Sequence, residues 1–274
     1  MNFKVVIPAR LASSRLPGKV LLDVAGHPML EWTWRNAVAS GADEVVVATD
    51  SDKVAALCEQ LGAVVCMTDP AHPSGTARLA EVVEHYGWDA DAIVVNVQAD
   101  EPMLPPQLVR QVARGVAHDA VARMATLCEP IDSLQTLLDP NAVKVLRDIN
   151  DHAMIFTRAP NPWARDAFSD LLQRGVPDFL QDEKNALLNL SPYRRHIGLY
   201  AYRAGFVRQY VRWPACMAEQ LENLEQLRVL HHGEKILVLD ALCSAGVGVD
   251  TLQDLARVNA LLAGRQPGEA LPCG

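Results

Sequence analysis

The chain has 274 residues, half of them hydrophobic, and a formal net charge of -8. This length can bury a full core in one or two units. The acidic balance argues against a nucleic-acid binder, whose affinity comes mainly from neutralised phosphates, although a local basic pocket is compatible with it. The apolar run near the N-terminus is too short for a signal sequence or a membrane span, which predicts a soluble protein.

The cysteines show neither a C-x-x-C pair nor the spacing of a metal site. They are Cys58, Cys66, Cys128, Cys216, Cys243 and Cys273. Reduced, mostly buried thiols are therefore expected, and thiols of this kind are typical of the cytoplasm.

The first half of the chain alternates between apolar runs and helical patterns. Four near-continuous apolar runs predict strands that are covered on both faces. These runs are Phe3–Ile7, Glu44–Ala48, Ala63–Met67 and Ala92–Val97. Strands separated by helices indicate a mostly parallel sheet with flanking helices, an α/β fold.

Three helices are expected between or after these strands. Leu30, Trp34, Ala37 and Val38 have the spacing of one apolar helix face. The stretch "SDKVAALCEQLG" predicts a second helix, and "PPQLVRQVARGVAH" predicts a third that begins at its prolines. In open α/β sheets ligands bind at the carboxyl ends of the strands. The unusual polar segments of this chain come directly after its predicted strands, at those ends.

The second half is less periodic, and 138–202 mixes short apolar pieces with Pro, Arg, Asp and Asn. No internal repeat or linker is found. We therefore expect a single domain over 1–274, with a core of approximately 1–135 and 225–274 and a smaller inserted lobe of approximately 136–224.

The first strand is followed by a loop, "ARLASSRLPGK", that carries Arg10, Arg15 and Lys19. The loop lacks the first glycine and the hydroxyl residue of a Walker motif, and "GVGVDT" lacks the third glycine of a dinucleotide fingerprint. Three cations at the end of a strand suit the oxygens of a triphosphate. A solvated basic loop would show the same spacing.

Two acidic residues complement these cations. Asp100 follows the fourth apolar run, and Asp250 precedes Thr251, which predicts the N-cap of a final helix. Each acid alone has the features of an ordinary strand-end or capping residue. Beside a triphosphate they would suit Mg²⁺, which proteins hold through one or two carboxylates together with phosphate oxygens.

Several stretches resemble, in order, those of the 3-deoxy-manno-octulosonate cytidylyltransferases, the CMP-Kdo synthetases. They are "IPARLASSRLPGK", "VATDSDKV", "CMTDPAHPSGTARLAEVVE", "NVQADEPM", "DPNAVKV", "RRHIGLYAYRAGF", "ENLEQLRVL" and "GVDTLQDLARV". The resemblance covers nearly the whole chain. It implies a glycosyltransferase-A-like nucleotidyltransferase fold, a homodimer whose inserted lobe serves sugar binding and dimerisation, and Mg²⁺ as cofactor. It also implies transfer of CMP from CTP to the sugar acid Kdo for lipopolysaccharide biosynthesis.

The resemblance also implies roles for single residues. On the nucleotide side these are Arg10, Arg15 and Lys19 at the phosphates, Ser74 and Gly75 at the base, and Gln98 facing both nucleotide and sugar. Asp100 and Asp250 match the metal-binding acids and, with Lys19, the catalytic set. On the sugar side these are Arg78, Arg158, His196, Tyr200, Glu225 and Gln226.

The chain departs from the family pattern at Ala99, at "APNPW", at "CMAE" and in a stretch around 175–191. The last three fall in the half expected to contact the sugar, so 8-amino-Kdo or a sialic acid stay open as substrates. The remaining alternative is a non-catalytic nucleotide-binding regulator. Such a protein is expected to have lost a metal acid or the loop lysine, yet Lys19, Asp100 and Asp250 are all present.

Overall fold

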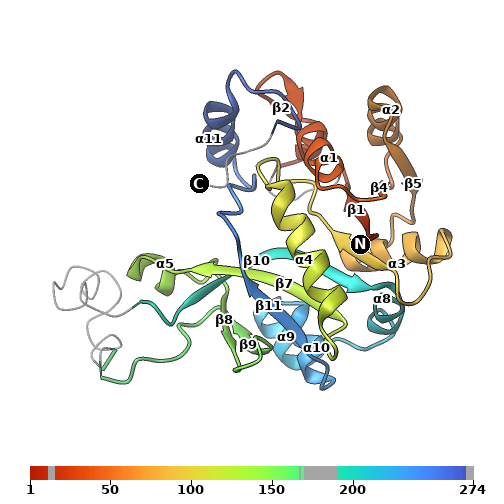
Figure 1. The fold of residues 1–274 in the computed structure, drawn as a ribbon. Coiled ribbons are helices and arrows are strands. Elements are labelled where there is room, and N and C mark those ends of the chain that lie inside the picture. The colour runs from red at the N-terminus through yellow and green to blue at the C-terminus, as the bar shows by residue number, and fades with distance from the viewer. Residues whose placement is uncertain (12–15, 167, 170–189, 270–274) are drawn as a thin grey trace. The chain divides into compact units, whose positions relative to one another are not determined.

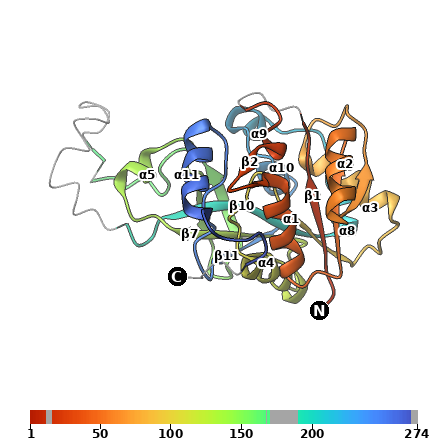
Figure 2. The ribbon, with the colours of Figure 1, turned by 90° about the horizontal axis from the view of Figure 1, so that it is seen from above.

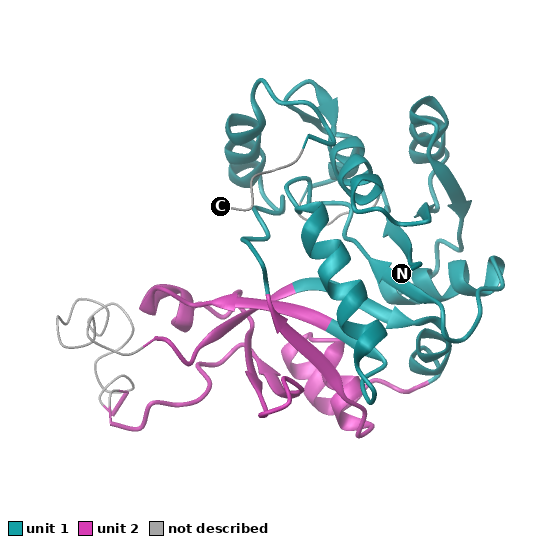
Figure 3. Cartoon of the chain, viewed as in Figure 1, with its two compact units in different colours: residues 1–125, 198–212, 241–274 teal, residues 126–197, 213–240 magenta. Residues whose placement is uncertain are grey.

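The computed structural model describes residues 1–11, 16–166, 168–169 and 190–269. Arg15 and most of the stretch 175–191 lie outside these residues. The chain divides into two compact units (Figure 3): unit 1 comprises 1–125, 198–212 and 241–274, and unit 2 comprises 126–197 and 213–240. Both units thus differ from the expected core and lobe, because 198–212 belongs to unit 1 and 225–240 to unit 2.

Unit 1 is built around a sheet with the strand order β10-β6-β1-β4-β5. Its strands are β1 (Lys4–Pro8), β4 (Glu44–Thr49), β5 (Val64–Met67), β6 (Ile93–Asn96) and the end of β10 (Arg194–Arg203). The first four are parallel, whereas residues 200–203 of β10 run antiparallel to β6. The predicted parallel sheet is confirmed, and β1, β4 and β6 are largely buried because both of their faces are covered. The prediction is wrong for the edge strand β5, where Val64 is 46% and Met67 is 49% exposed.

The helices of unit 1 are α1 (Met29–Ala39), α2 (Asp52–Leu61), α3 (Gly75–His85), α4 (Pro106–His118), α8 (Ala204–Tyr210) and α11 (Leu252–Leu262). Helix α1 packs beside α4, and α3 packs beside α8 (Figures 1 and 2). A short hairpin, β2 (Asp23–Val24) and β3 (His27–Pro28), and a single 3-10 turn, η1 (Lys19–Leu21), precede α1.

The predicted face of α1 is partly wrong. Leu30, Trp34 and Ala37 are buried as expected, but Val38 is 47% exposed. The buried face instead continues through two polar residues, Thr33 and Asn36. Both hydrogen bond to backbone carbonyls of the loop after β6, so this side of α1 contacts a loop and not only apolar core.

Unit 2 contains α5 (Leu134–Leu138), β8 (Lys144–Arg147), β9 (Ala153–Thr157), α9 (Met217–Glu222), α10 (Gln226–His231) and β11 (Ile236–Asp240). Strand β8 pairs antiparallel with β9, and Arg195 of β10 pairs with Lys144 of β8. Strand β7 (Met124–Pro130) and strand β10 each contribute residues to both units. A small apolar cluster forms around Leu137, Phe168 and Tyr193.

The thiols match the expectation in part. Cys58, Cys66, Cys128 and Cys216 are free and buried. Burial raises the pKa of Cys58 to about 11 and that of Cys128 to about 12, because a thiolate is poorly solvated in an apolar surrounding. Cys243, by contrast, is disulfide-bonded, so the expectation of reduced thiols is wrong at that position. Among the described residues no helix is long and apolar enough to span a membrane.

Candidate active site

The loops after the parallel strands of unit 1 leave the sheet at one edge, because the strands point in one direction. Arg10 and Lys19 follow β1, and Asp100 follows β6. Asp250 comes from far along the chain, directly before α11. The fold therefore gathers predicted site residues that are distant in sequence.

The ammonium group of Lys19 lies between the two predicted metal acids. It donates to Asp100 Oδ2 in a very short contact, to Asp250 Oδ1 at 3.0 Å and to the carbonyl of Val249 at 3.3 Å. Burial opposes the charge of Lys19, but the hydrogen bonds and charges of Asp100 and Asp250 outweigh this effect and raise the pKa of Lys19 above its ordinary value. Two carboxylates and a carbonyl thus converge on one cation.

Local sequence explains how Lys19 reaches this position. Gly18 adopts φ 68°, a left-handed conformation that favours glycine, and η1 begins immediately after it. Leu16, before the turn, is buried in a cluster with Val249, Val258 and Leu262. The same apolar cluster therefore anchors the loop of Lys19 and the segment that ends at Asp250.

The segment before Asp250 runs along the loop of Asp100. The backbone N–H of Val249 donates to the carbonyl of Asp100 at 2.9 Å. A Cβ at Gly246 would lie 2.7 Å from Met103 Cβ, and one at Gly248 would lie 2.8 Å from Glu101 Oε1. At Gly246 the neighbouring atoms include the backbone of Met103, so the close approach requires this glycine, whereas the Glu101 side chain beside Gly248 can move aside. Thr251 then caps α11 in a capping box with Asp254, as the sequence predicts for the N-cap.

The loop of Asp100 is also held from α1. Thr33 Oγ1 donates to the carbonyl of Ala99 at 3.1 Å, and Asn36 Nδ2 donates to the carbonyl of Pro102 at 2.9 Å. Sequence reasoning missed both residues. The signal that could have found them is a polar pair, three positions apart, on the side of α1 that an apolar face would otherwise occupy.

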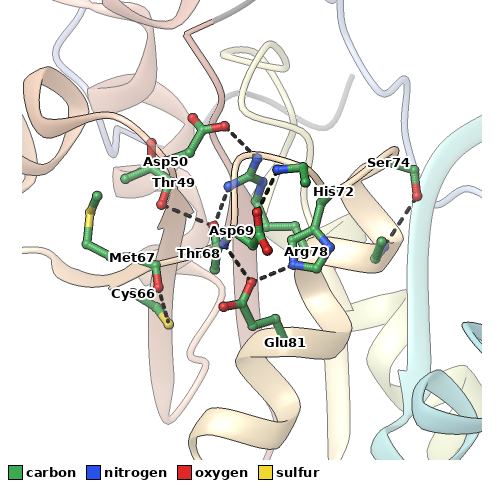
Figure 4. Close-up of polar contacts among 12 residues, drawn as sticks. Thr49, Asp50, Cys66, Met67, Thr68, Asp69, His72, Ser74, Arg78 and Glu81 are labelled. Atoms are coloured by element: carbon green, nitrogen blue, oxygen red, sulfur yellow. Dashed lines mark hydrogen bonds and ion pairs between the residues drawn. The ribbon is translucent and has the colours of Figure 1, made fainter.

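Ser74 and Gly75 lie at the start of α3, where Ser74 Oγ accepts from the N–H of Ala77 at 3.3 Å. The side chain of Arg78, one turn later, points toward Asp50 and Thr68 (Figure 4). It is 3% exposed and donates to Asp50 Oδ2 at 2.8 Å and, in a short contact, to Thr68 Oγ1. Thr68 Oγ1 in turn donates to the carbonyl of Thr49 at 3.1 Å. The guanidinium thereby ties α3 to the ends of β4 and β5.

The structure gives Arg78 a structural role in addition to the predicted one. Its guanidinium is already engaged by Asp50 and Thr68, so the structure gives it the geometry of a positioning residue for the start of α3. Contact of Arg78 with the sugar acid stays a prediction. Beside it, His72 Nε2 lies 2.5 Å from Glu81 Oε2, and Glu81 also accepts from the N–H of Asp69, which fixes the loop between β5 and α3.

Comparisons with known proteins identify the family of the chain. A family model described as cytidylyltransferase matches residues 4–236. The chain belongs to the cytidylyltransferase family. It is 57% identical to 3-deoxy-manno-octulosonate cytidylyltransferase 1 of Hydrogenovibrio crunogenus, with 99% of this chain and 100% of the relative covered.

Two further relatives agree. The chain is 52% identical to the 3-deoxy-manno-octulosonate cytidylyltransferase of Pseudomonas fluorescens, covering 95% of this chain and 98% of the relative. A solved structure of CMP:2-keto-3-deoxy-manno-octonic acid synthetase complexed with CTP is 37% identical, with a TM-score of 0.81 over 95% of this chain and 98% of that one. The predicted family resemblance and nucleotidyltransferase fold are confirmed, and this cytidylyltransferase is an enzyme.

Most predicted sugar-side residues of this cytidylyltransferase lie in unit 2. Arg158 follows β9, His196 lies on β10, and Glu225 and Gln226 lie at the start of α10. Tyr200 belongs instead to unit 1, opposite Asn96 of β6. Gln98 also lies in unit 1, two residues beyond β6.

His196 is a neutral hydrogen-bonding group. Burial lowers the pKa of His196 to about 3, so its imidazole carries no charge at neutral pH. Its Nε2 lies 3.0 Å from Thr126 Oγ1, whose single proton is donated to the carbonyl of Ile197 at 3.0 Å. Because the hydroxyl has no second proton, Nε2 of His196 must be the donor in their contact.

Arg158 is held by a residue that sequence reasoning missed. Its Nε donates to the carbonyl of Glu222 at 2.6 Å, and its backbone N–H donates to Glu222 Oε2 at 2.6 Å. Glu222 Oε1 accepts from Thr157 Oγ1 at 2.7 Å. The stretch "EQLENLEQL" predicts a helix with a solvated acidic face, and the structure turns Glu222 of that stretch toward β9.

Proposed function

We propose that this cytidylyltransferase transfers CMP from CTP to the anomeric hydroxyl of Kdo, giving CMP-Kdo and pyrophosphate for lipopolysaccharide biosynthesis. The observation that carries the proposal is the convergence of Lys19, Asp100 and Asp250 at the ends of β1 and β6, in a chain 57% identical to a 3-deoxy-manno-octulosonate cytidylyltransferase. The geometry supports a site for a polyphosphate and its counterion, and the relatives support the sugar acid.

The residues present fit Mg²⁺. Asp100 and Asp250 offer hard carboxylate oxygens that already approach one cationic group, the Lys19 ammonium. Among the described residues no cluster of three or more metal-ligating side chains occurs, which suits an ion that takes its other ligands from substrate phosphates and water. In the proposal Asp100 and Asp250 hold Mg²⁺, which when bound supplies charge neutralisation and lowers the pKa of a coordinated hydroxyl.

The reaction joins two substrates by an in-line displacement. The anomeric hydroxyl oxygen forms a bond to the α-phosphorus of CTP and releases its proton. The bond between the α-phosphorus and the bridging oxygen breaks, and pyrophosphate leaves with the electron pair. Such a transfer depends on positioning and charge neutralisation more than on a nucleophilic side chain.

The chain's own residues supply these two functions in the proposal. Arg10, Arg15 and Lys19 bind the triphosphate and neutralise the leaving pyrophosphate, and Lys19 exchanges its carboxylate partners for phosphate oxygens. Ser74 and Gly75 contact the base, and Gln98 faces nucleotide and sugar. Arg158, His196, Tyr200, Glu225 and Gln226 contact the sugar acid, with His196 donating from Nε2 to Thr126.

A homodimer acting in the cytoplasm belongs to the same proposal. Unit 2 exposes large apolar side chains, with Met217 and Leu221 of α9 each 76% exposed and Met154 of β9 60% exposed. Exposed apolar side chains of this size favour contact with a second chain. Sedimentation of the purified protein tests the dimer, and a monomer at micromolar concentration would contradict it.

The function is tested by pyrophosphate release with CTP and Mg²⁺. Kdo, 8-amino-Kdo and N-acetylneuraminate are compared as acceptors, with UTP and ATP as nucleotide controls. We expect release with CTP and Kdo. Release only with 8-amino-Kdo or N-acetylneuraminate would change the assigned sugar acid, and CTP binding without release for any acceptor would favour a non-catalytic regulator.

A further inference from the structure

In the loop after β6, the five consecutive backbone carbonyls of residues 98–102 each accept a hydrogen bond. A buried carbonyl without a donor costs free energy, so a complete set indicates a loop held in one conformation. Three of the donors are backbone N–H groups, and two are side chains of α1. In the order of their acceptors, the donors are the N–H of Glu101, Thr33 Oγ1, the N–H of Val249, the N–H of Leu104 and Asn36 Nδ2.

Two of these carbonyls belong to the peptide units on either side of the Cα atom of Asp100. The unit before it carries the carbonyl of Ala99, which accepts from Thr33 Oγ1 at 3.1 Å. The unit after it carries the carbonyl of Asp100 itself, which accepts from the N–H of Val249 at 2.9 Å. Each peptide unit is planar, so fixing both planes fixes φ and ψ of Asp100 and the direction of its Cα–Cβ bond. The Thr33 hydroxyl therefore holds one of the two planes that direct the Asp100 carboxylate to Lys19.

The hydroxyl of Thr33 has a second acceptor within its own helix. Thr33 Oγ1 lies 3.5 Å from the carbonyl of Met29, one turn earlier, which is the acceptor that a threonine inside a helix commonly uses. A hydroxyl has a single proton, and the shorter distance is the one to the carbonyl of Ala99. Thr33 is 1% exposed and Ala99 is 4% exposed, so solvent does not reach this contact to replace the hydroxyl.

Asn36 holds the far end of the same loop. It lies three positions after Thr33, on the same side of α1, and its Nδ2 donates to the carbonyl of Pro102 at 2.9 Å. Proline has no backbone N–H, so the carbonyl is the backbone group through which Pro102 can be held by a hydrogen bond. The two polar side chains thus contact the loop on both sides of Asp100.

We propose that Thr33 is a positioning residue for Asp100, and that Asn36 assists it by holding the far end of the loop. The inference rests on the proposed function, in which Asp100 holds Mg²⁺, and deepens it by naming the group that sets the direction of this carboxylate. Thr33 affects the reaction through the backbone of the loop.

Two variants of Thr33 separate the hydroxyl from the shape of the side chain. Thr33→Val keeps the shape and removes the donor, whereas Thr33→Ser keeps the donor and removes the methyl group. We expect kcat to fall about tenfold in Thr33→Val, as for loss of one hydrogen bond, and to stay within about twofold of wild type in Thr33→Ser. The KM values for CTP and Kdo should change less than about twofold, because no side chain assigned to substrate binding is altered.

Ser40→Ala is the matched control. Ser40 directly follows α1 and is also buried, but its Oγ donates to the carbonyl of Ala37, within the helix, at 2.6 Å. The control variant should lose thermal stability as Thr33→Val does and keep the wild-type kcat. A kcat that falls equally in Ser40→Ala, or that stays unchanged in Thr33→Val, would overturn the inference.

A double-mutant cycle shows whether Thr33 acts through Asp100. In the Asp100→Asn background, Thr33→Val should lower the residual kcat no further, because the carboxylate that it positions has already been removed. A further tenfold loss in the double variant would mean that Thr33 acts by another route, and would contradict the proposal.

Amide hydrogen exchange in the free protein tests the inference without substrate or metal. The N–H groups of Glu101 and Leu104 close the turns of the loop and should exchange about tenfold faster in Thr33→Val and in Asn36→Leu, but not in Ser40→Ala. If Thr33→Val fails to fold, Asn36→Leu provides the comparison. Unchanged exchange overturns the inference alone, whereas absence of turnover with any sugar acid in wild type overturns the proposed function.

Discussion

Lys19 Nζ and Asp250 Oδ1 lie 3.0 Å apart although 231 positions separate them in the sequence. The contact exists because the apolar cluster around Leu16 and Val249 brings the loop after β1 against the segment before α11. Asp100 completes the group from the loop after β6. The site is therefore assembled from three segments of unit 1, each fixed by backbone contacts of its own.

Replacement of Asp100 by asparagine should remove most turnover and leave the fold intact. The amide keeps the size of the side chain but loses the charge that pairs with Lys19 and that we assign to Mg²⁺ binding. We expect kcat to fall about 100-fold or more, as for loss of one charge-stabilising group in other enzymes.

Turnover against Mg²⁺ concentration and thermal melting measure the two effects separately. Asp89→Asn, at an exposed acid in the same unit, is the control and should behave like wild type. Near-normal kcat in Asp100→Asn would refute the metal assignment.

The strands of unit 1 could be predicted because parallel strands covered on both faces appear as continuous apolar runs. The loop cations and Asp100 could be located for the same reason, since they follow those runs, whereas Asp250 could be located from the predicted N-cap of the final helix, Thr251. The start of α4 at Pro106 likewise follows from the local preference of proline for the first helical turn.

The contacts that position these residues could not be predicted, because they are tertiary. Nothing local in "SGTAR" indicates that Arg78 reaches Asp50, and nothing in "LENLEQL" distinguishes Glu222 from a solvated acid. Lys144 sits within an apolar strand pattern, where only the structure reveals that its ammonium is buried. Val38 fits the helical period of α1, yet tertiary packing leaves it exposed.

Gly246→Ala should destabilise the protein and reduce activity. Gly246 has φ +80°, and a Cβ would lie 2.8 Å from the carbonyl oxygen of Met103, which is backbone and cannot move aside cheaply. We expect a loss of about 2 kcal/mol in the free energy of unfolding, together with a lower kcat because the same segment places Asp250.

Gly87→Ala is the matched control, because Gly87 also has positive φ, +60°, but nothing lies within 4 Å of a Cβ there. Chemical denaturation compares the two variants. Equal losses in the free energy of unfolding for both variants, with full activity in Gly246→Ala, would contradict the prediction. The close approach of Gly246 to Met103 would then matter neither for stability nor for activity.

Stability should fall in mild acid because of His196. Burial lowers the pKa of His196 from 6.5 to about 3 in the folded state, so below pH 6.5 the unfolded chain binds a proton that the folded chain does not. The contribution of His196 to the free energy of unfolding should therefore decrease as pH falls from 6.5 toward 3, by up to about 1.4 kcal/mol per pH unit.

Urea unfolding across this pH range, in wild type and His196→Asn, measures the contribution as a difference. His231→Asn, at an exposed histidine of the same unit, should keep the wild-type slope. Identical slopes in wild type and His196→Asn would mean that the imidazole is accessible to protons in the folded state.

Asp50→Asn should weaken CTP binding and leave sugar binding unchanged. The substitution removes the charged partner of Arg78, whose side chain is 3% exposed, and leaves a buried guanidinium without its carboxylate. The start of α3, where Ser74 and Gly75 lie, then loses its tie to the end of β4. We expect a loss of about 2 kcal/mol in stability and a rise of about tenfold in the KM for CTP.

Asp52→Asn, at an exposed acid two residues away, is the control for charge alone. Steady-state kinetics with CTP and Kdo varied in turn provide the comparison. A rise in the KM for Kdo with an unchanged KM for CTP would instead show that Arg78 contacts the sugar acid, as the family resemblance implies. In that case the loss of Asp50 would disturb a contact between the Arg78 guanidinium and the substrate.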